Sequence, residues 1–255
     1  MRVRGRVAAG LLGSVSSYYG FREETPSPMR RREGPGRDVV VIVSFGEVWS
    51  IDGQRLTSFA AGLRDCQVRT RHEGRSFGIH VNLSPPAAYT LFGLPLHTLA
   101  HRQVPLENVL DEPFLAERLH GAGDWDARFL LLDGVIARRL ADSRPASPGV
   151  LWAWRRLVET NGAVRIGELT RELGWSRKRI AARFREEIGL PPKQAARLLR
   201  FERARELAEA AERPDWARVA VEAGYYDQSH LINEFREVTG RTPATFLQDG
   251  ATQAA

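Results

Sequence analysis

The pattern of apolar and polar positions changes character along the chain near residue 111. Over residues 37–84, short β-branched runs alternate with turn residues; the clearest run is Val39–Phe45, and segments 67–70 and 76–83 follow the same pattern. Beyond residue 111, apolar residues recur at helical spacing, over 114–119 and again over 124–141. The pattern therefore predicts an α+β fold, in which a β-rich part precedes helices.

A short segment divides the chain. Residues 143–149 contain two prolines and a glycine but no large apolar residue, which is typical of a linker. We therefore expect one domain over 1–142, a linker over 143–149, an all-helical domain over 150–249 and a disordered tail over 250–255.

The helical part contains an internal repeat. The pattern F-R-E-x-x-G-x-x-P begins at Phe184 and occurs again at Phe235, 51 residues later. Two matching segments at this spacing indicate two similar supersecondary units in tandem.

Each unit is predicted to be a helix, a tight turn and a second helix. In the first unit, Gly174 supplies a left-handed turn residue, Trp175 plugs the core and Ser176 caps the next helix. In the second unit, Gly224 makes the turn and Asp227 caps, with Tyr225 and Tyr226 as the plug. One such unit would fit an ordinary helical hairpin equally well, but two with equivalent turns and caps favour the helix-turn-helix plan.

These motifs carry a resemblance to a known family. Residues 150–247 resemble the DNA-binding domain of AraC/XylS transcription regulators, most closely over Ala223–Pro243 (AGYYDQSHLINEFREVTGRTP) and more loosely around Leu173–Arg177. The resemblance implies two helix-turn-helix subdomains joined by a long helix, from Pro192 to about Ala210. Such a helix would hold the two recognition helices about 34 Å apart, in successive major grooves.

Residues 17–141 are similar, more loosely, to the amino-terminal domain of a subgroup of these regulators. The segments Tyr18–Glu23 and Pro85–Pro95 carry that likeness. It implies a small β-barrel followed by helices, which would serve as a sensor or dimerisation domain over residues 1–142. The two resemblances together imply duplex DNA at an operator or promoter as the partner, with RNA polymerase, a small-molecule effector and a second copy of the chain as further partners.

The outward positions of the two second helices are the candidate DNA contacts. Arginine and lysine can pair with guanine or grip phosphates, glutamine and asparagine can pair with adenine, and Ala181, Ala182 and Ile232 can touch thymine methyls. The alanines depart from the polar residues usual in the family, which puts strong readout by the first helix in doubt. The predicted DNA-binding set is Arg177, Lys178, Ala181, Ala182, Arg185, Gln228, Ser229, Ile232, Asn233 and Arg236.

An effector pocket in the β-rich part is expected by analogy with the family. Its candidate lining residues are Trp49, Phe59, Arg69, His80 and Asn82, although the aromatic residues fit strand core equally well.

An enzyme built on the β-rich part is the main alternative. His72, His80, His97 and His101 are its candidate metal ligands, but no tight His-x-His with a matching glutamate is present. No nucleophilic triad stands out, and Cys66, which we interpret as structural, cannot alone supply the cysteines of a DNA-repair fusion. We therefore expect no catalytic residues, no metal and no cofactor.

Composition changes this picture little. The formal net charge of +6 favours a polyanionic partner, but Lys178 and Lys193 are the only lysines, so GC-rich codon usage also accounts for the arginines. The sequence contains no apolar run of the roughly 20 residues that cross a bilayer. The amino terminus only weakly resembles an export signal, so we expect a cytoplasmic bacterial protein with no membrane partner.

Overall fold

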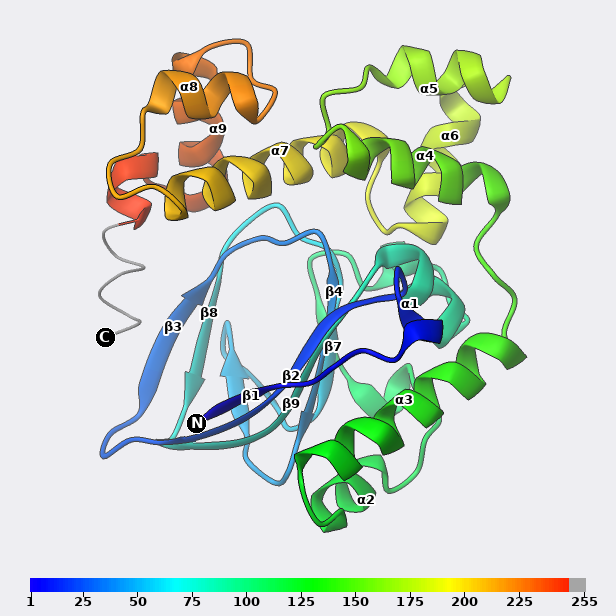
Figure 1. Cartoon of the computed structure of the whole chain (residues 1–255), viewed down its shortest axis with the longest axis vertical. Coiled ribbons are helices and arrows are strands. Elements are labelled where there is room, and N and C mark those ends of the chain that lie inside the picture. The colour runs from blue at the N-terminus through cyan, green and yellow to red at the C-terminus, as the bar shows by residue number, and fades with distance from the viewer. Residues whose placement is uncertain (248–255) are drawn as a thin grey trace.

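The computed structural model describes residues 1–247 of the 255-residue chain, so the tail expected over 250–255 lies outside the described residues. Two antiparallel sheets form the amino-terminal part (Figure 1). The larger sheet has the order β1 (Arg2–Arg4), β2 (Val15–Glu24), β9 (Arg75–Leu83), β4 (Val39–Ser44), β7 (Phe59–Ala61) and β10 (Gln103–Pro105). The smaller sheet has the order β3 (Met29–Glu33), β8 (Val68–His72), β5 (Trp49–Ile51) and β6 (Gln54–Leu56).

The expected barrel is present only in an open form, because the strands pair as two separate sheets. Strands β1, β2 and β3 precede residue 37 and were not predicted. In β3 the sequence MRRRE offers no apolar alternation, so its pairing with β8 leaves no periodic signal in the sequence.

Helices pack against the face of the larger sheet that is turned away from the smaller sheet. They are α1 (Pro85–Phe92), the 3-10 helix η2 (Leu96–Thr98), α2 (Leu115–Gly121) and α3 (Trp125–Asp142). Helix α3 begins where Asp124 accepts a hydrogen bond from the Ala127 amide at 2.8 Å, and it packs Phe129 against Tyr18 with ring centroids 4.9 Å apart. The indole of Trp125 occupies the space above Gly20, where a Cβ atom would lie 1.9 Å from the ring.

The carboxy-terminal part is helical, as predicted. Its helices are α4 (Pro148–Glu159), α5 (Ile166–Leu173), α6 (Arg177–Glu187), α7 (Pro192–Glu209), α8 (Trp216–Glu222) and α9 (Gln228–Thr239). The connection between α3 and α4 spans residues 143–147 and is anchored to α6, because the hydroxyl of Ser147 donates to the buried Glu187 carboxylate at 3.0 Å.

The two helix-turn-helix units are attached to the rest of the molecule differently. The first unit shares one hydrophobic core with the β-rich part, in which Ile180, Phe184 and Ile188 join Leu96 and Leu99. The second unit has its own core around Phe201 and Phe235 and is carried by the second half of α7. In Figure 1, α7 runs across the top of the two sheets and links the units. Within residues 1–247, the structure contains no helix with the length and apolar character needed to cross a membrane.

Candidate nucleic-acid interface and ligand cavity

The turn of the first unit is built as the sequence predicts. Gly174 adopts φ +62°, in the left-handed region that glycine tolerates without strain. Ser176 then caps α6 by accepting a hydrogen bond from the Arg179 amide at 3.1 Å. Ile180 and Phe184 are buried, which leaves the opposite face of α6 toward solvent.

The second unit repeats this plan with one difference from the prediction. Gly224 has φ +80°, and Asp227 caps α9 by accepting from the His230 amide at 2.7 Å. Tyr225 is buried and its hydroxyl donates to Glu234 at 3.1 Å, but Tyr226 is 91% exposed and is not a core plug. The prediction for Tyr226 is wrong because the turn directs only one of the two adjacent rings inward.

The predicted DNA-contacting side chains lie on the free faces of α6 and α9. Ala181 and Ile232 are partly buried, and Ile232 packs against the core of the second unit. The exposed members are Arg177, Lys178, Ala182, Arg185, Gln228, Ser229, Asn233 and Arg236. Both helices therefore present polar and cationic groups to solvent, as a DNA-reading surface requires.

Two neighbouring arginines of α6 are already engaged within the protein. Arg183 pairs with Glu186 at 2.9 Å and with the buried Glu187, while the guanidinium of Arg179 lies 4.7 Å from the Trp175 ring centre. These contacts leave Arg177, Lys178 and Arg185 as the cations that are available to phosphates along this helix.

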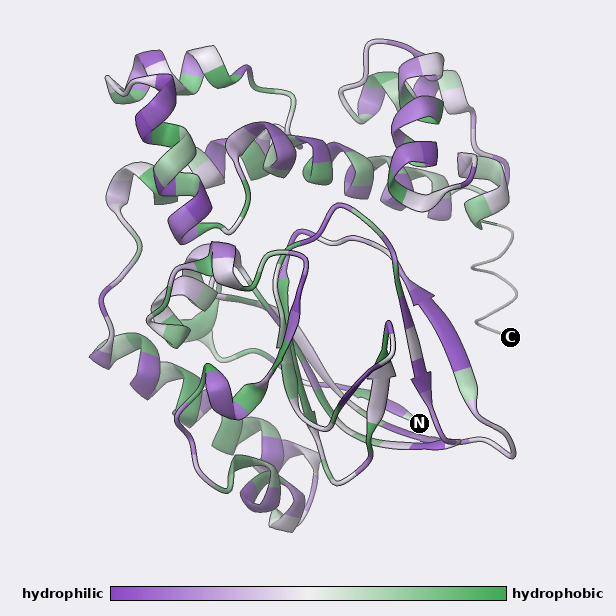
Figure 2. Ribbon diagram, turned by 180° about the vertical axis from the view of Figure 1, so that it is seen from behind, coloured by the Kyte–Doolittle hydropathy of each residue, from purple (hydrophilic) through white to green (hydrophobic). Residues whose placement is uncertain are grey.

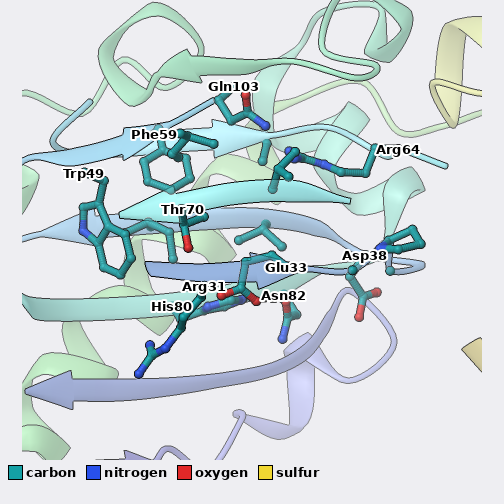
Figure 3. A pocket seen from close by; sticks show the side chains of 18 of the residues that line it. Arg31, Glu33, Asp38, Trp49, Phe59, Arg64, Thr70, His80, Asn82 and Gln103 are labelled. Carbon is teal, nitrogen blue, oxygen red and sulfur yellow. Dashed lines mark hydrogen bonds between the residues drawn. The ribbon is translucent and has the colours of Figure 1, made fainter. Parts of the chain in front are cut away.

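A cavity of about 410 Å³ lies between the two sheets. Its wall combines side chains of both sheets with Glu202 and Arg205 of α7, so the helix that links the units also borders the cavity. Figure 3 shows Trp49 and Phe59 at one end, and Arg64 and Asp38 toward the other. The cavity thus has an apolar end and a polar end, and its volume suits a small molecule.

Arg64 is the most unusual side chain of this cavity. It is 7% exposed, and burial lowers the pKa of its guanidinium. With the Gln103 amide oriented so that its oxygen accepts, that oxygen lies 2.7 Å from Nη1 of Arg64, and no carboxylate of the described residues forms an ion pair with it. An unpaired buried charge is costly, so Arg64 makes the polar end a favourable place for an anion.

The carboxyl groups near the cavity have raised pKa values, whereas the pKa of Arg64 is lowered. Burial raises the pKa values of Glu33, Asp38 and Glu202, although arginines lower them in part. Nε of Arg37 lies 3.5 Å from Oε2 of Glu202, which joins the segment before β4 to α7. Part of the cavity wall is therefore a contact between the β-rich part and the helical part of the chain.

Of the predicted effector residues, Trp49, Phe59, His80 and Asn82 line this cavity and Arg69 does not. Arg69 lies on the outer face of the smaller sheet, because successive strand residues point to opposite faces and its neighbour Thr70 points inward. The His80 ring bonds the Tyr19 hydroxyl at 2.8 Å and the Asn82 amide oxygen at 2.9 Å, and burial lowers the pKa of His80 to about 4. His80 is therefore neutral at physiological pH.

Arg64, Arg37 and the α7 residues were missed by sequence reasoning. Each lies in a loop or on a helix whose position over the cavity depends on the tertiary fold. An isolated arginine in an arginine-rich chain gives no local signal.

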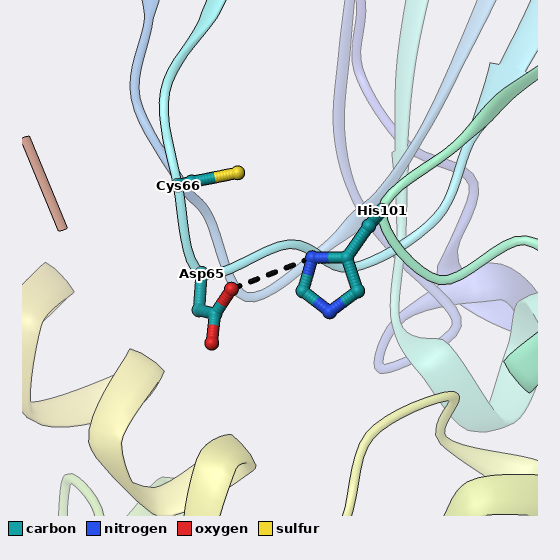
Figure 4. Close-up of side chains that lie close together, drawn as sticks. All are labelled: Asp65, Cys66 and His101. Carbon is teal, nitrogen blue, oxygen red and sulfur yellow. Dashed lines mark ion pairs between the residues drawn. The ribbon is translucent and has the colours of Figure 1, made fainter.

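Asp65, Cys66 and His101 form the group of possible metal ligands found among residues 1–247, with ligand atoms within 4.8 Å of one another (Figure 4). Nδ1 of His101 lies 3.4 Å from Oδ1 of Asp65. Cys66 is exposed, contrary to the structural role predicted for it, and partial burial followed by the charge of Asp65 raises the pKa of its thiol. A solvent-exposed acid–imidazole contact accounts for this geometry.

Comparison with known proteins agrees with the carboxy-terminal architecture. Residues 169–249 match a family model described as a helix-turn-helix domain. No curated protein matches the chain significantly.

Solved structures of ToxT from Vibrio cholerae share the fold over most of the chain. Apo ToxT carrying one substitution has a TM-score of 0.51 at 11% identity, covering 91% of this chain and 97% of that one. ToxT bound to an unsaturated fatty acid has a TM-score of 0.50 at 10% identity, covering 92% and 96%. ToxT bound to (E)-4-(8-methylnaphthalen-1-yl)but-3-enoic acid has a TM-score of 0.50 at 10% identity, covering 92% and 98%.

Two capped helix-turn-helix units on one long helix, preceded by a two-sheet domain, define a helix-turn-helix protein with an additional β-rich domain. Residues 169–249 therefore form a helix-turn-helix domain, as the sequence predicts.

Proposed function

We propose that α6 and α9 read duplex DNA through the ten residues predicted from the sequence. The exposure of Lys178 and Asn233 on these two helices carries the proposal, because buried side chains in these positions could not reach base edges. Lys178 donates to guanine, whereas Gln228 and Asn233 pair with adenine. Arg177, Arg185 and Arg236 contact phosphates.

Selection of bound sites from random duplexes, combined with genome-wide capture of bound DNA, tests this proposal. The expected result is one enriched site with two half-sites about one helical turn apart. Recovery of DNA without any enriched sequence would contradict sequence-specific reading.

We further propose that an amphipathic carboxylate in the cavity controls the regulator. The supporting observation is Arg64, a buried guanidinium that has no ionic partner among residues 1–247 and lies opposite the aromatic end formed by Trp49 and Phe59. A carboxylate at Arg64 would supply the missing partner, and an apolar body would contact the rings. The ToxT structures that share the fold contain an unsaturated fatty acid and an arylbutenoic acid, both of this chemical class.

Helix α7 connects the cavity directly to the second recognition helix, α9. Glu202 and Arg205 border the cavity, and Phe201 of the same helix packs on Phe235 of α9 with ring centroids 4.5 Å apart. The first unit, in contrast, is fixed to the β-rich part through the shared core. A ligand that shifts α7 would therefore change the spacing of the two recognition helices, and with it the affinity for DNA.

A series of cis-unsaturated fatty acids of increasing chain length, each paired with its primary alcohol, tests the ligand class. One acid should raise the melting temperature and change DNA affinity, while its alcohol should do neither to a comparable extent. Saturating ligand at about 100 times its dissociation constant would add about 2.7 kcal/mol to the free energy of unfolding. Equal effects of acid and alcohol would contradict the role of Arg64.

The remaining partners follow from the regulator class. We propose that the protein acts in the bacterial cytoplasm, where its DNA is, as a homodimer that contacts RNA polymerase. Analytical ultracentrifugation with and without DNA tests the dimer, and transcription with purified polymerase tests the second contact.

A further inference from the structure

The outer face of the smaller sheet carries arginines directly opposite one another. In the register of β3 and β8, Arg30 lies opposite Arg71, and Arg32 lies opposite Arg69. Like charges in opposite positions of an antiparallel pair destabilise the sheet. The fold therefore gains nothing from this arrangement.

The rest of the sheet extends the same cationic row. Ser50 of β5 pairs with Arg71, and Arg55 of β6 pairs with Ser50, so Arg55 shares the face of Arg30 and Arg71. We call this set the arginine face: Arg30, Arg32, Arg55, Arg69 and Arg71. In Figure 2, β3 and β8 carry the hydrophilic colour along much of their length. An open depression on this side of the sheet is lined by Arg30, Arg32, Ser50, Asp52, Arg69 and Arg71 among others.

Few carboxylates neutralise the arginine face. Glu73 pairs with Arg71 at 2.9 Å, and within residues 1–247 no ion pair is formed by its other members. Asp52 borders the depression, but its Oδ1 accepts a hydrogen bond from the Arg69 backbone amide at 3.0 Å. Nε of Arg71 is buried without an acceptor. The face thus offers several guanidinium donors without internal partners.

The end of β3 lies beside the second helix-turn-helix unit. Gly34 directly follows β3, and a Cβ atom at Gly34 would lie 3.9 Å from Cζ of Phe246, the residue that packs on Phe235 of α9. The strand that carries Arg30 and Arg32 therefore ends near the unit that contains α9, and a long polyanion bound at α9 is a suitable partner for the face. Guanidinium groups match phosphate oxygens in charge and in geometry.

We propose that the arginine face binds phosphates of duplex DNA that flanks the segment read by α6 and α9, a role that rests on the proposed DNA-binding function. The contact is independent of base sequence, lengthens the bound segment and increases the dependence of affinity on salt. The β-rich domain then contains the cavity and also contacts DNA through the arginine face.

The test compares two lengths of duplex, each carrying the site that selection enriches. About 20 bp suffices for two recognition helices in successive grooves, and about 40 bp adds the flank. The full-length chain is compared with a variant carrying Arg30→Gln, Arg32→Gln, Arg69→Gln and Arg71→Gln. On the long duplex, the slope of log K against log salt should become about 3.6 smaller in magnitude, since each of the four lost phosphate contacts contributes about 0.9. On the short duplex the slope should not change.

A matched control removes four exposed arginines outside the face: Arg4→Gln, Arg6→Gln, Arg102→Gln and Arg144→Gln. This variant has the same net charge and should retain the wild-type slope on both duplexes. If the salt slope on the long duplex falls equally in the two variants, the proposal is overturned, because the change in net charge alone would then explain the fall. A further outcome would also overturn the proposal. In it, the wild-type chain and the control bind phosphatidylglycerol vesicles, the face variant does not, and the salt slopes for DNA are the same in all three proteins. The face would then be a binding site for anionic lipid. Loss of short-duplex binding by the wild-type chain would instead contradict the proposed function of α6 and α9.

Discussion

Arg37 and Glu202 connect the β-rich domain to the helix that carries the second DNA-binding unit, with Nε and Oε2 3.5 Å apart. Glu202 belongs to α7 and borders the cavity together with Arg205. The same contact therefore meets the cavity on one side and the helix that carries the second unit on the other. Under the proposed control by a ligand, it is the contact through which occupancy of the cavity would change the position of the second unit.

Replacing Glu202 with Gln should alter the pH dependence of stability in a defined direction. Burial raises the pKa of Glu202, and the charges of Arg37 and Arg205 reduce this rise. At pH values just above the usual pKa of glutamate, Glu202 therefore binds more protons in the folded state than in the unfolded state. The free energy of unfolding should therefore fall as pH rises through that window. The Glu202→Gln variant should lose this part of the fall, measured by urea unfolding at several pH values.

The control for this experiment is Glu212→Gln, an exposed residue beyond the end of α7. It should retain the wild-type pH dependence. Identical profiles for wild type and Glu202→Gln would show that the carboxyl does not titrate in a buried setting.

Replacing Arg64 with Met should stabilise the ligand-free protein, by about 1–3 kcal/mol, because it removes a buried charge that lacks an ionic partner. The same variant should lose the response to a carboxylate ligand. Urea unfolding and thermal shift measure the two effects, and Arg102→Met at an exposed position is the matched control. A variant that is less stable yet still responds to the acid would contradict both roles.

The helix-turn-helix units could be predicted from the sequence because their signals are local. A positive φ at Gly174 and Gly224 and a capping side chain at Ser176 and Asp227 depend on residues within one turn of the chain. The family resemblance supplied the long helix, which the structure places at Pro192–Glu209.

The cavity could be predicted only in part, because its wall depends on contacts between distant segments. Strands β2 and β9 pair across about 60 residues of sequence, and a one-residue change of register reverses which side chains face inward. This alternation explains why Arg69 was placed in the pocket although Thr70 points there. The burial of Arg64 arises only when its loop packs against Gln103.

Replacing Asn233 with Ala should cost about 1–3 kcal/mol of binding free energy and relax preference at one base pair. The side chain is exposed on α9, so folding should not change. Site selection with the variant measures the preference. Selectivity equal to that of the wild type would show that Asn233 does not read a base.

Replacing Arg185 with Ala should weaken binding to every sequence by a similar factor. A phosphate contact carries no sequence information, and its loss should reduce the magnitude of the salt slope by about 0.9. Arg183→Ala is an informative comparison, because Arg183 is already paired with Glu187 and should affect stability more than salt dependence. Affinity of the Arg185 variant that matches wild type at low and high salt would remove this residue from the interface.

Replacing Arg69 with Thr should stabilise the protein, because it removes the like-charge pair with Arg32 and places a β-branched residue on a strand. The expected gain in the free energy of unfolding is about 0.2–1 kcal/mol at low salt, and it should shrink as salt screens the repulsion. Arg75→Thr, at an exposed position of β9 opposite Glu24, is the matched control and should not stabilise. A gain in stability together with a loss of affinity for long duplexes would mean that the sheet retains its opposed arginines for binding rather than for folding. If the Arg69 variant is less stable than wild type at low salt, the arginine pairs contribute to the fold, and the physical argument for the arginine face fails.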